Sequence, residues 1–459
     1  MRAPCSACWR GVPALPERLE AYLDAVAASI GWRRARPFVL RELRTHLLEQ
    51  KEDFLASGMT EEAAEEAAVR EMGDAAQVGA ALNDIHRPRE QRLLLGAVVV
   101  LAVLGVFLRF ALTWGWETEM PHPLKTPLAL AVGLAALVGG YFLDYRLLER
   151  YARQVFLTAL ALGIVSLHLS PKVNHVAWWA RNLVLLYPPV YAAWVAHCGK
   201  GWKGQMEAAL GIIPLCIVAM AAPSMLGLAV LIVTWFAVEV AAADADWFGV
   251  GRKEGLSAIF GSGAAVMAQV LNCLIRGSER LAVALHPEKD PLGSGYLAMT
   301  VRNMLSGAQW LGRGSTGTVY GDLPYERIVP EWGGDLLLTT VIHKLGWLPF
   351  FLLAGAVLSL AAVITVKALR LRNGFGRLLA LSAGLTLGVQ TVMAIAMNLG
   401  YVFCSCPMPL LSGNLHTIVT LALLGLALSA FRQEALPEES PRAAASAPAV
   451  QAQPAGPVS

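Results

Sequence analysis

A single aspartate stands where a long polar segment gives way to an apolar run. Residues 276–334 are mostly polar, and Asp335 opens an apolar stretch that extends to about residue 366. At the start of a helix, the free N–H groups and the helix dipole favour a carboxylate in its charged form. A charged acid at the rim of a membrane helix is a candidate functional group, and a carboxylate can act as general base on a hydroxyl. From the residues alone, a simple N-terminal cap is the alternative interpretation of Asp335.

Three arginines of the same polar segment are candidates for binding an anionic group. Arg280, Arg302 and Arg313 carry positive charge, which stabilises negative charge that develops during a reaction. Solvated loop charges are the alternative interpretation of all three.

Other polar residues fall inside apolar runs. His416 lies in the last run and is expected to face either the helix bundle or a cavity. Gln390 and Asn398 are expected to hydrogen-bond between helices. Glu239 is expected to lie near the cytoplasmic end of its run and to extend its carboxylate to the membrane surface.

The elements that position these residues are membrane helices. Hydrophobic residues make up 56% of the 459 residues and charged residues 15%, and the mean hydropathy is +0.52. Soluble domains contain about 25% charged residues. The net charge of +3 is too small to indicate a nucleic-acid partner. The composition therefore predicts an all-α, polytopic membrane protein.

Apolar runs separated by short polar breaks predict about ten transmembrane helices. Crossing a hydrocarbon core of about 30 Å requires about 20 apolar residues as helix. The predicted spans are 93–113, 127–146, 154–170, 180–197, 206–222, 224–243, 256–275, 335–366, 378–402 and 410–431. Pro223 is typical of a tight turn between two spans.

The lysines and arginines of the short loops predict the orientation. They precede the first span and follow the second, fourth, sixth and eighth spans, so that all basic loops lie on one side. By the positive-inside rule this side is cytoplasmic, and the N-terminal domain and the C-terminal tail lie there. The long segment 276–334 then lies outside the cell. Its tyrosines and Trp310 indicate an ordered loop.

Residues 17–89 predict a small soluble bundle of about four helices. Leucines at helical spacing form apolar stripes in a charged background. Gly58 and Gly73 are typical helix stops, and Thr60 and Asp74 are typical helix starts. Residues 1–16 and 434–459 are predicted to be disordered, because the tail is rich in Ala, Pro and Ser. Residues 90–433 form the predicted membrane domain.

The outer segment also carries short motifs in a fixed order. They are Arg280-Leu281, His286-Pro287, Asp290-Pro291, Gly295-Tyr296, Ser306-Gly307, Trp310, Gly312-Arg313-Gly314, Val329-Pro330-Glu331, Asp335 and Leu345-Gly346, with Pro409-Leu410-Leu411-Ser412-Gly413 before the last span. This set resembles the outer loops of the SEDS family, the membrane glycosyltransferases of the FtsW, RodA and SpoVE type. The resemblance is good over about 276–431 and weak but collinear over about 92–275.

Residues 17–89 resemble the HAAS or permease-prefix domain, which is fused to various membrane proteins and has an interaction or signalling role.

The SEDS resemblance implies polymerisation of lipid II at the outer membrane face, with Asp335 at the position of the family's essential aspartate. It implies lipid II and undecaprenyl diphosphate-linked glycan as substrates, a class B penicillin-binding protein as partner, and contact with membrane lipid. A divalent cation, Mg²⁺ or Mn²⁺, near Asp335 is compatible with the resemblance, although no ligand cluster in the sequence requires one. The residues that it places at the substrate are Arg280, Arg302, Arg313, Trp310, Glu331, Ser412 and His416.

The sequence also departs from the family pattern. Gly333-Gly334 stand where the family has His-Thr, and His343-Lys344 stand where it has a pair of glutamates. The alternative hypothesis is therefore a SEDS-like scaffold or lipid-binding subunit of a cell-wall synthesis complex that does not catalyse. A transporter is a third class, but the internal repeats typical of transporters are not evident.

Overall fold

The structure is a computed structural model that describes residues 15–113, 125–173, 176–276, 278–315, 328–329, 334–402, 404–412 and 415–435. The chain divides into two compact units. One contains the described residues up to Glu90 together with residues 432–435, and the other runs from Gln91 to Phe431. The predicted tails 1–16 and 434–459 lie almost entirely outside the described residues.

The N-terminal unit is a four-helix bundle. Its helices are α1 (Glu17–Ser29), α2 (Arg36–Ala56), α3 (Glu61–Met72) and α4 (Ala75–His86). Gly58 and Gly73 adopt positive φ angles of 92° and 83°, which glycine tolerates without strain. The Asp74 side chain accepts a hydrogen bond from Gln77 N at 3.0 Å and caps α4. The predicted stops and starts therefore lie where the helices end and begin.

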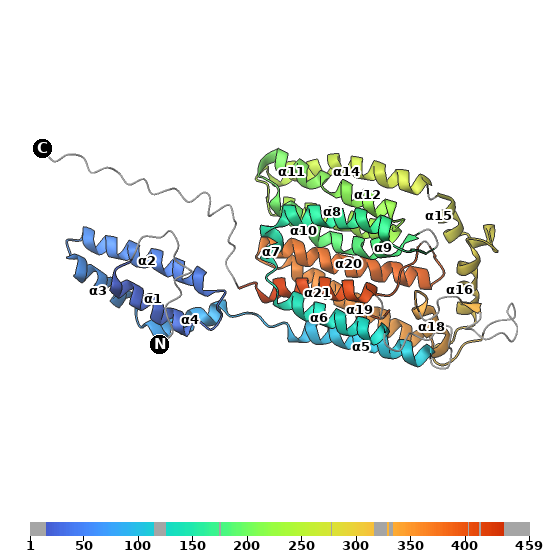
Figure 1. Ribbon diagram of the computed structural model, residues 1–459, viewed down its shortest axis with the longest axis horizontal. Helices are drawn as coiled ribbons and strands as arrows, with labels where there is room; N and C mark the ends of the chain where they lie inside the picture. The colour runs from blue at the N-terminus through green and yellow to red at the C-terminus, as the bar shows by residue number, and fades with distance from the viewer. Residues whose placement is uncertain are drawn as a thin grey trace. The chain divides into compact units, whose positions relative to one another are not determined.

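The second unit is a bundle of helices that run side by side (Figure 1). Its long helices are α5 (Arg92–Thr113), α6 (Lys125–Phe142), α8 (Ala152–Leu169), α13 (Met225–Asp244), α14 (Arg252–Arg276), α19 (Trp347–Leu369), α20 (Gly374–Asn398) and α21 (Leu415–Arg432), and its shorter ones include α7 (Arg146–Arg150), α11 (Gly201–Leu210) and α12 (Ile212–Ala221). Within the described residues, eight helical segments are long and apolar enough to cross a membrane: the long helices other than α14, and α11 with α12 as one segment. This confirms the all-helical, polytopic prediction.

The predicted span 206–222 changes helix at Gly211, between α11 and α12, and two further predicted spans are broken in the structure. The span 180–197 consists of α9 (Trp178–Leu183), the 3₁₀ turn η2 (Val184–Leu186) and α10 (Tyr187–His197). Pro188 lies in the first turn of α10, where its missing N–H is tolerated because no helical partner is needed there.

The span 335–366 is likewise divided, into α18 (Leu337–Leu345) and α19, at Gly346. Gly346 has a φ of 105°, and a Cβ atom there would lie 2.5 Å from the carbonyl oxygen of Trp310. The prediction of one long helix was wrong here, because hydropathy does not register a glycine that a neighbouring loop requires.

One end of the bundle carries the described part of the long polar segment. Here α15 (Ser278–Leu285) and α16 (Tyr296–Ser306) lie at the same end as α18, with α16 next to α18 (Figure 1). The turn η3 (Pro287–Lys289) lies between α15 and α16 in the chain. The two-residue strands β1 (Lys172–Val173) and β2 (Val176–Ala177) pair immediately before α9. We refer to this region as the outer end of the bundle, following the predicted orientation.

The interior of the bundle also holds a buried acid. Glu239 of α13 is 1% exposed, and Tyr191 of α10 donates a hydrogen bond to its Oε1 at 2.6 Å. Its carboxylate therefore does not reach the membrane surface, contrary to the prediction. Hydropathy placed it near a helix end, but α10 covers it.

Candidate functional site

Asp335 lies in the turn that leads into α18. The residue is 8% exposed. Its carboxylate Oδ2 accepts a hydrogen bond from the hydroxyl of Ser405, a residue of the segment between α20 and α21. The carboxylate is thus directed toward the segment between α20 and α21. This hydrogen bond is not a cap, because its donor is a side-chain hydroxyl and not a backbone N–H group of α18.

The N-terminus of α18 is capped by a different residue. Asn398, the last residue of α20, accepts a hydrogen bond from Thr339 N at its Oδ1, at 2.8 Å. Its Nδ2 donates to the backbone oxygen of Asp335 at 3.0 Å. Asn398 is completely buried. Because Asn398 supplies the cap, the Asp335 carboxylate is available for another role.

A guanidinium group completes the network. Arg181 of α9 donates from Nη1 to the Oγ of Ser405 at 2.6 Å. Ser405 therefore accepts a hydrogen bond from the arginine and donates one to Asp335. Both Arg181 and Ser405 are half-buried. The carboxylate and the guanidinium lie on either side of one hydroxyl, without direct contact, and we call these three residues the carboxylate–arginine network.

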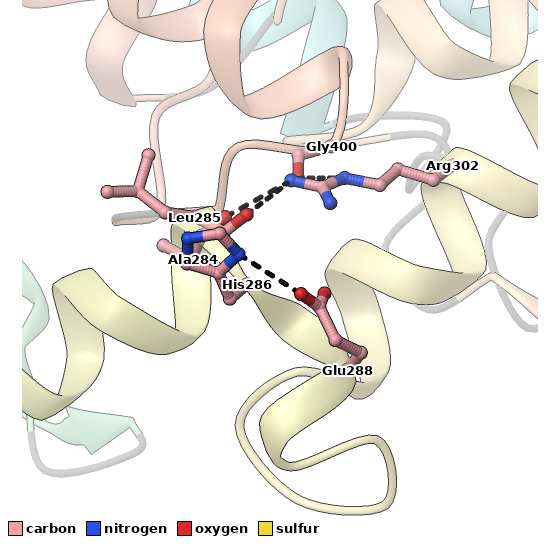
Figure 2. A network of polar contacts seen from close by, with 6 residues as sticks. All are labelled: Ala284, Leu285, His286, Glu288, Arg302 and Gly400. Atoms are coloured by element: carbon pink, nitrogen blue, oxygen red, sulfur yellow. Dashed lines mark hydrogen bonds and ion pairs between the residues drawn. The ribbon is translucent and has the colours of Figure 1, made fainter.

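Arg302 occupies a separate network at the outer end (Figure 2). Its Nη2 donates to the carbonyl oxygens of Ala284 and Leu285, at 3.4 and 3.3 Å, and its Nε donates to the carbonyl oxygen of Gly400 at 3.3 Å. Its guanidinium carbon also lies 5.2 Å from the centre of the Tyr401 ring. These contacts join the C-terminus of α15 to α16 and to the turn after α20, which is a structural use of the charge.

Two further predicted residues lie apart from the carboxylate. Trp310 is 71% exposed and stacks on Phe351 of α19, with ring centres 6.3 Å apart. Its backbone oxygen accepts a hydrogen bond from Leu348 N at 3.1 Å. Arg313 is exposed. The structure therefore does not bring either side chain into the carboxylate–arginine network.

Ser412 and His416 are both buried beneath this region. Ser412 Oγ lies 3.2 Å from Thr417 Oγ1, and its carbonyl oxygen accepts a hydrogen bond from Arg109 Nη1 at 2.6 Å. His416 is 3% exposed, and its Nε2 has no hydrogen-bond partner among the described residues. His416 lies within electrostatic range of Arg181, so it borders the network. The side chain of Arg280 and the whole of Glu331 lie outside what the structure describes.

Sequence reasoning missed Arg181 and Ser405. The available signal was a charged residue at the beginning of the predicted span 180–197, because charge within a membrane span is itself a functional indicator. Ser405 gave no signal, since it lies in a short turn far from Asp335 in sequence.

The residues of the network do not fit a metal site. It offers one carboxylate and one hydroxyl, and Mg²⁺ or Mn²⁺ prefers several oxygen ligands. Among the residues that the structure describes, no group of three or more His, Cys, Asp or Glu side chains could hold a metal ion. We therefore assign no step to a cation.

Comparisons with known proteins agree with this architecture. The chain is 28% identical over 328 residues to the probable peptidoglycan glycosyltransferase FtsW of Methylococcus capsulatus, covering 67% of this chain and 79% of the relative. It is 24% identical over 358 residues to the protein of the same name from Trichlorobacter lovleyi, covering 73% and 92%. A chain from the structure of a peptidoglycan synthase complex superimposes with a TM-score of 0.54 at 21% identity, covering 73% of this chain and 97% of that one.

The sequence pattern of a whole family also matches. It is the cell cycle protein family of FtsW, RodA and SpoVE, and the match spans residues 91–435. That range includes every helix of the bundle and all three residues of the carboxylate–arginine network. The chain therefore belongs to the FtsW/RodA/SpoVE family.

Proposed function

We propose that this protein is a peptidoglycan glycosyltransferase that polymerises lipid II at the outer face of the cell membrane, with Asp335 as its catalytic carboxylate. The observation that carries the proposal is the buried Asp335 carboxylate at the outer end of the bundle, oriented toward Ser405 and Arg181. Family membership and the names of the relatives support the same reaction.

The proposed reaction is an inverting glycosyl transfer. The hydroxyl oxygen of the acceptor sugar attacks the anomeric carbon of the lipid-linked glycan. The bond between that carbon and the diphosphate oxygen breaks, and undecaprenyl diphosphate leaves with the electron pair. Asp335 takes the proton of the attacking hydroxyl as general base, which requires that the carboxylate is not engaged in capping a helix.

We also infer a partner that crosslinks the product. The structural neighbour comes from a complex described as coordinating polymerization and crosslinking. A class B penicillin-binding protein would supply the crosslinking activity to this chain in the same way.

We further propose that α1–α4 form a HAAS-like interaction domain on the cytoplasmic side, because the basic loops of the bundle are expected on that side.

The test is lipid II polymerisation by the purified full-length protein, alone and with its candidate penicillin-binding partner. Asp335→Asn keeps the shape of the side chain and removes its basicity, so we expect a loss of glycan strands of about 10²–10⁴-fold. Glu288→Gln is the matched control. Glu288 is an acid of the same outer segment, its side chain is 61% exposed, and its ion-pair partner among the described residues is His286.

The outcomes separate the enzyme from the scaffold. Strands made by wild type and by Glu288→Gln, but not by Asp335→Asn, would support the enzyme. No product from folded wild-type protein with any partner would favour the non-catalytic scaffold, and the glycines before Asp335 would then mark lost catalysis.

A further inference from the structure

Arg181 is half-buried and yet uses few of its hydrogen-bond donors within the described part of the protein. Its side chain makes one hydrogen bond among the described residues, from Nη1 to Ser405 Oγ, and it forms no ion pair with any of them. A guanidinium carries several N–H donors in a rigid fork. Most of the donor capacity of Arg181 is therefore unused by the part of the chain that the structure describes.

Ser405 explains how this capacity is maintained beside a carboxylate. A hydroxyl has one proton, and the Oγ of Ser405 donates it to Asp335 while accepting from Arg181. The serine thus keeps the guanidinium from closing a direct, two-pronged salt bridge on the carboxylate. Such a bridge would occupy both the acid and the fork.

The neighbours of Arg181 add no competing negative charge. Cys404 and Cys406 flank Ser405 and lie within electrostatic range of Arg181, and His416 lies within the same range. Burial, together with the nearby charge of Asp335, raises the pKa of the Cys404 thiol to about 12, so this thiol is neutral at physiological pH. Asp335 is accordingly the sole anion of the immediate network among the described residues.

We propose that Arg181 binds the phosphate groups of the lipid-linked substrate, with Ser405 positioning it beside Asp335. The planar fork of a guanidinium matches phosphate oxygens in a bidentate manner. In this arrangement Arg181 would stabilise the negative charge of the diphosphate as it leaves. The carboxylate that takes the proton lies on the other side of Ser405. This inference rests on the proposed function and assigns a substrate contact within it.

The test measures binding rather than turnover. Full-length protein in detergent is titrated with a short-chain polyprenyl diphosphate, and separately with inorganic pyrophosphate, and the tryptophan fluorescence is followed because Trp178 and Trp179 share α9 with Arg181. Arg181→Gln is expected to weaken binding of the polyprenyl diphosphate by about 10–100-fold, the loss typical of a charge-assisted hydrogen-bonding group. Arg372→Gln makes the same change at an exposed arginine in the turn between α19 and α20 and is expected to alter the Kd by less than about twofold.

A lysine variant guards against misfolding. Arg181→Lys keeps the charge and loses the fork, so it should recover part of the affinity, and the melting temperature of each variant is measured in the same detergent. Unchanged affinity in folded Arg181→Gln would overturn the inference, as would an effect confined to inorganic pyrophosphate.

Binding and activity fail separately. If wild type binds the polyprenyl diphosphate through Arg181 but forms no glycan, the glycosyltransferase is wrong and the phosphate site stands. If Arg181→Gln binds normally and wild type polymerises lipid II, the function stands and the phosphate site falls.

Discussion

Two half-buried arginines at the outer end of the bundle are used in opposite ways. Arg302 donates to three carbonyl oxygens and lies over the Tyr401 ring. Arg181 donates to a single hydroxyl. The two residues have the same chemistry and the same class of burial, so neither property distinguishes them.

What distinguishes them is the number of their donors that the protein itself satisfies. Carbonyl oxygens at the end of a helix are unsatisfied acceptors, and Arg302 fills that need between α15, α16 and the turn after α20. An arginine with most of its donors used in this way holds structure and has less capacity for a ligand. An arginine with most of its donors unused, beside a carboxylate, is suited to bind an anion.

Activity gives the largest expected contrast between the two. Arg181→Gln should lower lipid II polymerisation by about 100-fold, because removing one preorganised donor to developing negative charge costs about 10²–10³ in rate. Its melting temperature should stay within about 2 °C of wild type, since a loss of under 1 kcal/mol shifts a large chain by no more. Glycan strands are measured on gels beside thermal unfolding of the same preparation. A folded Arg181→Gln that polymerises at the wild-type rate would erase the distinction.

Stability should show the reverse pattern. Arg302→Gln removes a charged donor from three carbonyls, of which those of Ala284 and Gly400 are part-buried, and should destabilise the outer end by about 1–3 kcal/mol, the penalty for leaving such acceptors unpaired. Hydrogen exchange is expected to rise in α15 and in the turn at Gly400. Arg302→Lys should restore part of the protection through its charge. If exchange is unchanged while activity falls as in Arg181→Gln, Arg302 belongs with the substrate residues after all.

Asn398 provides an intermediate case, because it supports the carboxylate without any charge. Asn398→Ala removes the cap of α18 and the bond to the Asp335 carbonyl, and should cost about 1–2 kcal/mol of stability. We expect polymerisation to fall about tenfold, since small displacements of a catalytic group are costly. Asn398→Asp keeps the acceptor for Thr339 N and loses the donor to Asp335. Activity reduced equally in the two variants would indicate that the bond to Asp335 matters and the cap does not, whereas wild-type activity in both would contradict a role for either interaction.

A third cation, Lys51 in the N-terminal unit, extends the comparison, and its substitution has the smallest expected effect. Lys51 donates to Glu61 and Glu65 at 2.8 Å each. These hydrogen bonds raise the pKa of Lys51, and Lys51 in turn lowers the pKa of Glu61. The contribution of Glu61 to folding stability is present above its unfolded pKa of about 4.3, and it is lost as pH falls through the lower folded pKa. The contribution of Lys51 to folding stability is present below its unfolded pKa of about 10.4, and it is lost as pH rises through the higher folded pKa.

Lys51→Met should therefore weaken α2 and α3 at neutral pH and have a diminishing effect toward acid. The measurement is the hydrogen-exchange rate of backbone amides in α2 and α3 of the full chain, expressed at each pH as the ratio of the variant's rate to the wild-type rate. Lipid II polymerisation should not change, because Lys51 lies in the other unit. A ratio that does not vary with pH would show that the ion pairs contribute no stability.

The regular parts of the fold were predictable because their causes are local. Apolar runs of sufficient length define helices in a bilayer, and glycines with positive φ, such as Gly58 and Gly73, end helices in the N-terminal unit. The breaks at Pro188 and Gly346 were harder to predict. Proline permits a helix to begin as well as to end, and Gly346 is required by the approach of the Trp310 carbonyl, which is a contact between distant segments.

By itself the sequence determined the membrane class, the helical bundle, the N-terminal unit and the candidacy of Asp335, because composition, hydropathy and motif order are properties of the chain alone. Only the tertiary structure decided which groups surround that carboxylate. Asn398 and Ser405 approach it from 63 and 70 residues away, and Arg181 joins Ser405 across 224 residues. Hydrogen bonds depend on distances of about 3 Å, and such distances between remote residues are set by how the helices pack.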